Sequence, residues 1–187
     1  MSKQVAVIVG ATSKWQADGR NTRLAHGGDI DDSALPVGIR WGVGGAIAQK
    51  FAREGFHVVL TTRAESNAAA LASAITDAGD KATIVELDLV SESSIKTAFA
   101  KIRKEIGEVD VLVYNAGYLE GRDLPKEQEL LEHIPTEMFD TAQHIASRGP
   151  FLIAKEVLPA MREKGQGSFL ISNNAASLRG RKRYTGQ

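Results

Sequence analysis

The sequence predicts an α/β fold, a doubly wound parallel sheet covered by helices on both faces. Three observations lead to this prediction. Short apolar runs alternate with helical segments along the chain. The strand-like runs are apolar at consecutive positions, which is typical of parallel strands buried on both faces. The first run ends at a glycine-rich turn that leads into a helix, as in nucleotide-binding sheets.

The composition places the chain among ordinary globular domains and excludes several classes of function. The 187 residues suit one domain, 1–187, and 43% hydrophobic content is enough for a core. Lys and Arg together number 23, as do Asp and Glu, so no overall charge favours nucleic acid or an anionic membrane. There is no cysteine, which excludes disulfides and thiolate metal sites and agrees with a reducing cytoplasm. We therefore expect a cytoplasmic protein with no membrane span and no secretory leader.

The expected strands and helices alternate regularly along the chain. Right-handed crossovers and a ligand at the first turn then favour the strand order 3-2-1-4-5. Within the last long helical region we expect an irregular patch near Gly149 and Pro150. The expected strands are 4–9, 56–61, 81–87, 109–114 and 168–171, and the expected helices are 43–53, 64–78, 91–106 with Ser91 as its N-cap, and 136–162.

The first strand–turn–helix unit is split by an insertion, Lys14 to Trp41. Removing it joins Gly10-Ala11-Thr12-Ser13 to Gly42-Val43-Gly44, which gives G-x-x-x-G-x-G between a buried strand and a helix. Glycines permit a tight turn and let backbone approach a pyrophosphate, and the helix N-terminus supplies free N–H groups. The predicted nucleotide-binding residues here are Gly10, Thr12, Ser13, Gly42, Val43 and Gly44.

The insertion 14–41 is polar and without a clear period, so we expect a long loop. Because its ends lie at the glycine turn, it could fold over a cofactor. The alternative of a surface insertion or oligomer contact stays open. Asp29, Asp31 and Asp32 suggest a solvated acidic turn rather than a metal site, and no metal is predicted.

Several spaced motifs follow one another along the chain. They are the split glycine turn, Leu87-Asp88-Leu89, Asn115-Ala116-Gly117, the segment from Gly149 to Met161, and Ser177-Leu178-Arg179-Gly180. Together they resemble the short-chain dehydrogenase/reductase family. The resemblance implies a Rossmann fold in which Asp88 binds the adenine amino group and Asn115-Ala116-Gly117 supports the sheet and lines the cofactor site. It also implies hydride transfer between a nicotinamide cofactor and a carbonyl or alcohol.

The end of the second strand indicates which nicotinamide cofactor is preferred. NAD-binding folds place an acid there to hold the ribose hydroxyls, whereas this chain reads Thr61-Thr62-Arg63. A cation suits the 2′-phosphate, so we expect NADP, with NAD possible. The alternative is that Arg63 is simply exposed at a strand end.

The resemblance weakens at the catalytic positions. The family uses a Tyr as general acid/base, a Lys four residues later that lowers its pKa, a Ser that orients the substrate and an Asn in a proton relay. Here Ala146 stands at the Asn position. Ser172 is the hydroxyl residue nearest to the family's Ser position. Counting back from Gly180 instead puts Asn174 at that position. Tyr184 is the candidate phenol, and its Lys would fall at position 188, after the last residue. The candidate catalytic residues are therefore Ser172, Asn174 and Tyr184.

Three functions follow from this sequence. The first is an NADP-preferring oxidoreductase acting on a small carbonyl or alcohol; the second is a binding module that holds NADP(H) without efficient chemistry, which Ala146 and Asn174 favour. A nucleic-acid contact through 179–183 is the third, but a solvated basic loop is the preferred interpretation. The resemblance implies a homodimer or homotetramer through 136–162. It also implies two further strands and about sixty more residues, judged by the family's usual domain length.

Overall fold

The computed structural model describes residues 3–12, 41–118 and 131–173. These residues form a five-stranded parallel sheet in the order β3-β2-β1-β4-β5, so the predicted fold class and strand order are confirmed. The elements are β1 (Val5–Val9), α2 (Gly42–Arg53), β2 (His57–Thr62), η1 (Glu65–Asn67), α3 (Ala69–Asp77), β3 (Lys81–Glu86), α4 (Glu92–Glu105), β4 (Val109–Tyr114), η4 (Leu131–His133), α5 (Thr136–Gln143), η5 (His144–Arg148), α6 (Gly149–Lys164) and β5 (Ser168–Ile171).

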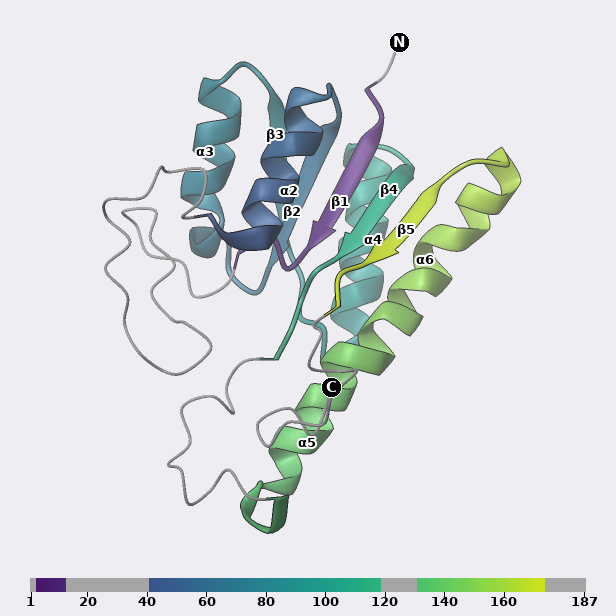
Figure 1. The fold of residues 1–187 in the computed structure, drawn as a ribbon. Helices are drawn as coiled ribbons and strands as arrows, with labels where there is room; N and C mark the ends of the chain where they lie inside the picture. Colours follow the sequence, from purple (N-terminus) through teal and green to yellow (C-terminus); the bar gives the residue numbers. More distant parts are fainter. Residues whose placement is uncertain (1–2, 13–40, 119–130, 174–187) are drawn as a thin grey trace.

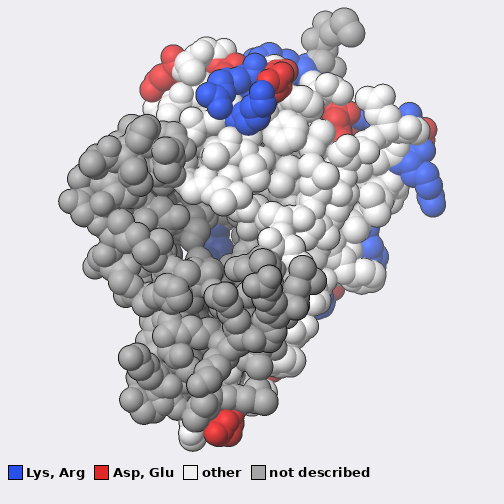
Figure 2. All heavy atoms as spheres, in the orientation of Figure 1, with Lys and Arg blue, Asp and Glu red and all other residues white. Residues whose placement is uncertain are grey.

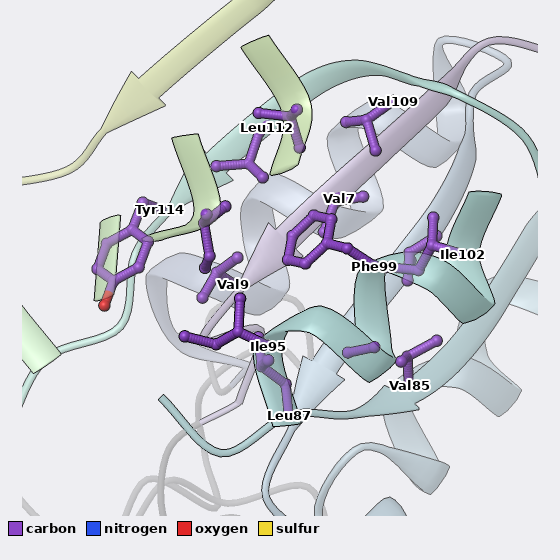
Figure 3. Packing of buried hydrophobic residues seen from close by; sticks show 14 of the residues in the cluster. Val7, Val9, Val85, Leu87, Ile95, Phe99, Ile102, Val109, Leu112 and Tyr114 are labelled. Atoms are coloured by element: carbon purple, nitrogen blue, oxygen red, sulfur yellow. The ribbon is translucent and has the colours of Figure 1, made fainter. Parts of the chain in front are cut away.

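Two helical layers enclose the sheet (Figure 1). Helices α2 and α3 cover one face, where Ile8, Leu60 and Leu71 belong to one apolar cluster. Helices α4 and α6 cover the other face, where Val7 and Phe99 belong to a second cluster (Figure 3). Strand β1 contributes alternate side chains to both clusters and is buried along its whole length, because it lies at the centre of the sheet.

All five strands run in the same direction, so their carboxyl ends meet at one edge of the sheet. In the register of β1, Val9 lies beside Thr61 on one side and Tyr114 on the other, and Tyr114 lies beside Ile171. The segments that follow β1, β4 and β5 therefore leave the sheet next to one another. In such sheets ligands bind at this edge, where the strand order reverses.

The predicted helix 64–78 is in fact two elements. A 3-10 turn, η1, is followed by α3, which begins only at Ala69. Ala68 at the junction has φ −112°, outside the helical range, and is fully buried in the cluster below α2. The Asn67 amide donates to the Thr62 hydroxyl at 3.4 Å, which holds the turn against the end of β2. The alanine-rich composition does not reveal this tertiary restraint.

The predicted irregularity in the last long helix is present, but it lies one turn earlier than expected. Residues His144–Arg148 form a π-helical turn, in which Gly149 N–H donates to the carbonyl of His144. Pro150 has no N–H, so the regular bond to the carbonyl of Ala146 is absent. The Tyr114 hydroxyl at the end of β4 donates to the carbonyl of Ile145, and its side chain points toward this helix in Figure 3. This hydrogen bond joins the π-helical turn to the end of β4.

One expectation about burial is wrong for both end strands of the described sheet, since only Val85 is buried in β3 and the last strand, β5, is more exposed still. The apolar runs predicted strands covered on both faces, and β1, β2 and the end of β4 agree. In β5, Leu170 and Ile171 are 50% and 58% exposed. Strand β5 is the end strand of the sheet in the described part of the chain, and apolar side chains at a sheet edge stay exposed unless another element covers them.

Charged side chains on the described surface carry both signs. Figure 2 shows Lys, Arg, Asp and Glu side by side near the edge where the strands begin, and most of the remaining visible described surface is uncharged. The residues that the structure describes include no helix long and apolar enough to cross a membrane.

Candidate functional site

The glycine turn lies at the carboxyl end of β1. Gly10 has φ +77°, a conformation that residues with a Cβ rarely adopt. A Cβ on Gly10 would also lie 2.6 Å from the Cα of Ala116, in the segment that follows β4. Glycine is therefore needed here for two reasons, the backbone conformation and the close approach of a second chain segment.

Gly44 brings the first turn of α2 against this glycine turn. A Cβ on Gly44 would lie 2.3 Å from the carbonyl oxygen of Gly10 and 2.9 Å from that of Ala11. Backbone atoms cannot move away at low cost, so any side chain would push α2 off the turn. The split motif is therefore reassembled in space, although 31 residues, 11 to 41, separate Gly10 from Gly42 in the sequence.

The N-terminus of α2 has two features that suit an anion. Its N-cap residue, Trp41, makes no side-chain cap hydrogen bond, and its first turn holds no acidic residue. Its first N–H groups therefore lack intrahelical partners and carry the positive end of the helix dipole. Nearby in the turn, the Thr12 hydroxyl oxygen is buried and has no hydrogen-bond partner among the described residues. Buried hydroxyls are usually satisfied, so this one is available to a bound group.

Asn115 connects the turn to the centre of the sheet. Its backbone N–H donates to the carbonyl of Val9 at 2.8 Å, which extends the pairing of β1 and β4 by one residue. Its side-chain amide donates to the carbonyl of Gly10 at 3.1 Å. The amide nitrogen would also lie 2.9 Å from a Cβ on Gly44, so the two motifs are in direct contact. Ala116 and Gly117 continue from Asn115 along the same edge.

The ends of β2 and β3 hold the remaining predicted cofactor residues. Arg63 directly follows β2 and is exposed. Asp88 is exposed after β3, where its carboxylate accepts from Val90 N–H at 3.0 Å and its own N–H donates to Ser94 Oγ at 3.0 Å. This turn positions Asp88 just before α4, whose predicted N-cap, Ser91, is confirmed. Leu89 is partly buried against the neighbouring core.

Only part of the predicted catalytic set lies in the described residues. Ser172 directly follows β5, and its hydroxyl donates to the side-chain oxygen of Asn115 at 2.9 Å. Ala146 is exposed in the π-helical turn. Asn174, Tyr184 and the cofactor candidate Ser13 lie outside the described residues, as do Asp29, Asp31, Asp32 and most of the insertion.

Sequence reasoning missed two residues that shape this edge. Trp41 was expected to end the polar insertion, but it is 6% exposed and packs in the core below α2, where a Cβ on Gly45 would lie 2.6 Å from its Cβ. Its apolar character next to Gly42 was the available signal. Tyr114 is 2% exposed, and burial raises its pKa, so the phenol stays protonated and donates to Ile145. No signal in the sequence indicated that contact.

Comparison with known proteins supplies the family. The sequence profile of a family described as short chain dehydrogenase matches residues 33–187, which is most of the chain. The chain belongs to the short-chain dehydrogenase family. The matched region begins inside the insertion, and β1, at the centre of the sheet, lies before it.

Individual relatives agree with this assignment. The chain is 29% identical to an uncharacterized oxidoreductase, YxjF, of Bacillus subtilis over 82% of this chain and 56% of the relative. It is 31% identical to the 3-oxoacyl-(acyl-carrier-protein) reductase of Escherichia coli, over 79% of this chain and 56% of the relative. It is 33% identical to the 2-(R)-hydroxypropyl-CoM dehydrogenase of Xanthobacter autotrophicus, over 81% of this chain and 61% of the relative.

A metagenomic short-chain oxidoreductase solved in complex with NADP superposes with TM-score 0.67 at 26% identity, over 91% of this chain and 62% of that chain. A putative short-chain dehydrogenase/reductase from Burkholderia xenovorans superposes with TM-score 0.72 at 24% identity, over 95% of this chain and 56% of that chain. This similarity shows the shared fold. The chain therefore spans between half and two thirds of the length of these similar proteins.

Proposed function

We propose that the protein is an NAD(P)-dependent oxidoreductase that transfers a hydride between a nicotinamide cofactor and a carbonyl or alcohol. The observation that carries the proposal is the turn between β1 and α2, where Gly44 lies against Gly10 beside the open N-terminus of α2. The buried hydroxyl of Thr12, which lacks a partner among the described residues, fits a phosphate acceptor at this place.

In this proposal the segments that follow the carboxyl ends of β1, β3 and β4 bind different parts of the cofactor. Residues Gly10 to Ser13 and Gly42 to Gly44 would hold the pyrophosphate, and Asp88 with Leu89 would hold the adenine. Asn115-Ala116-Gly117 would border the nicotinamide half. The bound dinucleotide would supply or accept the hydride, and the protein's part is to orient it and to manage the proton.

The substrate class is proposed from the chemistry of the family and of its named members. The relatives include a 3-oxoacyl-(acyl-carrier-protein) reductase and a 2-(R)-hydroxypropyl-CoM dehydrogenase. Both names describe interconversion of a carbonyl and an alcohol. For the proton, Tyr184 is the proposed general acid/base, and either Ser172 or Asn174 is proposed to orient the substrate oxygen. Turnover of small ketones, aldehydes or alcohols with NADP(H), followed at the nicotinamide absorbance, tests this proposal.

We propose NADP as the preferred cofactor because Arg63 lies exposed at the end of β2. A guanidinium there would pair with the 2′-phosphate, which NAD lacks. Arg63→Glu is expected to weaken NADPH binding about tenfold, because an attraction becomes a repulsion at a solvent-exposed site. NADH binding should change little. Titration of each cofactor by calorimetry measures both constants.

Arg53→Glu is the matched control, since Arg53 is exposed in the last turn of α2, away from the glycine turn, and the charge change is the same. It should leave the NADPH constant unchanged. An equal loss of NADPH and NADH affinity in Arg63→Glu would show that Arg63 does not read the 2′-phosphate.

A binding module without efficient chemistry is the second candidate. Ala146 favours it, because the side chain in the π-helical turn has no group for a proton relay. Tight NADPH binding without turnover across a broad panel of carbonyl compounds would support the module and contradict the enzyme.

Exposed apolar side chains on α5 and α6 bear on how the protein assembles. We propose a cytoplasmic homodimer or homotetramer that associates through α5 and α6. The large exposed apolar side chains Phe139, Phe151 and Leu158 on these helices support the assembly. Light scattering after size exclusion would give the mass, and a monomer at micromolar concentration would contradict this part.

A further inference from the structure

A chain of hydrogen bonds runs from the end of β5 to the glycine turn. Ser172 Oγ donates to Asn115 Oδ1 at 2.9 Å, and Asn115 Nδ2 donates to the carbonyl of Gly10 at 3.1 Å. We propose that Ser172 is a positioning residue that holds the Asn115 amide and, through it, the nucleotide-binding turn. This inference rests on the proposed function, because it assigns Ser172 to cofactor binding rather than to the substrate oxygen.

The orientation of the Asn115 amide follows from its neighbours. The carbonyl of Gly10 can only accept a hydrogen bond, so the amide NH2 must face it. The amide oxygen then faces Ser172, which must donate. Both ends of the amide are therefore fixed, one by the glycine turn and one by the hydroxyl after β5. Loss of either partner would release the amide from this single orientation.

Ser172 is itself held in place. Its backbone N–H donates to the carbonyl of Tyr114 at 2.9 Å, which continues the pairing of β4 and β5. Its hydroxyl has one proton, and Asn115 Oδ1 at 2.9 Å is nearer than the other acceptor, the Tyr114 carbonyl at 3.3 Å. A hydroxyl whose only proton is directed to Asn115 cannot at the same time donate to a substrate carbonyl.

These hydrogen bonds link the segment after β5, at Ser172, to the glycine turn at Gly10. The turn at Gly10 contacts the phosphate-binding end of α2, where Gly44 lies against Gly10 and Asn115 together. A change at Ser172 should therefore alter cofactor affinity through Asn115. The substrate-orienting role in catalysis would then fall to the other candidate, Asn174.

The test compares Ser172→Ala with Ser172→Thr in the full chain, with NADPH affinity from calorimetry and kcat and KM from turnover. Ser172→Ala should bind NADPH about 3- to 10-fold more weakly, the effect of one lost hydrogen bond. Ser172→Thr keeps the hydroxyl and should restore affinity, since the position is exposed and admits a methyl group. In an Asn115→Ala background, Ser172→Ala should have no further effect on NADPH affinity.

Ser168→Ala is the matched control, because Ser168 is exposed at the opposite end of β5. It should leave affinity unchanged. If the unmodified chain binds NADPH and Ser172→Ala binds it equally well, the inference is wrong; a fall in kcat with unchanged NADPH affinity would also overturn it and assign Ser172 to the substrate. If the unmodified, folded chain binds neither NADPH nor NADH, the proposed function itself fails.

Discussion

Replacement of Gly44 by alanine is expected to lower NADPH affinity about 100-fold or more. The new Cβ would lie 2.3 Å from the carbonyl oxygen of Gly10 and 2.9 Å from that of Ala11, so α2 must move away from the turn. The phosphates would then lose at least two charge-assisted hydrogen bonds, each contributing about 1.5 kcal/mol or more. The crowding itself should lower the free energy of unfolding by about 1–3 kcal/mol. Calorimetry and chemical denaturation measure the two effects.

Ala46→Gly separates loss of affinity from loss of stability. Ala46 is exposed on the same helix, and glycine there should lower the free energy of unfolding by about 0.5–1 kcal/mol without entering the turn. NADPH affinity should stay at the level of the unmodified chain. If Gly44→Ala binds NADPH as well as Ala46→Gly does, the close approach of Gly44 to Gly10 has no role in cofactor binding.

The second large effect is expected where α6 begins. A Cβ on Gly149 would lie 2.5 Å from the Tyr114 hydroxyl oxygen and 3.2 Å from the carbonyl of His144. Gly149→Ala should therefore lower the free energy of unfolding by about 1–3 kcal/mol. Tyr114→Phe alone should lower it by about 0.5–1.5 kcal/mol, because the carbonyl of Ile145 loses its donor.

The double variant distinguishes this steric cause from general disruption. Without the hydroxyl, the nearest ring atom is Cζ at 3.5 Å, an ordinary contact distance. Gly149→Ala with Tyr114→Phe should thus lose less stability than the sum of the two single changes. Tyr114→Phe combined with the remote Ala46→Gly should be additive. Additive losses for the Gly149 pair would contradict the packing described at the π-helical turn.

The fold was predictable because its signals are local and regular. Each apolar run between helical segments matched a strand, and the strand order followed from the handedness of parallel crossovers. The glycine motif was recognised across the insertion because Val5–Val9 and Gly42-Val43-Gly44 kept the strand and helix on either side. The N-cap at Ser91 was predictable for the same reason, since a cap and its helix are neighbours in sequence.

The contacts that complete the candidate site were not predictable, because they join residues far apart in the chain. Ser172 and Asn115 are 57 positions apart, and the sequence indicated only that one lies after β5 and the other after β4. The contact of Tyr114 with Ile145 fixes the π-helical turn and leaves no local pattern. The burial of Trp41 was not predicted, because the residue was grouped with the insertion that precedes the glycines of α2.

The most direct test of the account is a calorimetric titration of the 187-residue chain with NADPH. The glycine turn, the open N-terminus of α2 and the Thr12 hydroxyl predict one saturable site per chain that Gly44→Ala removes. Binding of one NADPH that is lost in Gly44→Ala and kept in Ala46→Gly is the predicted result. A folded chain, verified by circular dichroism, that takes up neither NADPH nor NADH would contradict the assignment of this turn as a nucleotide site.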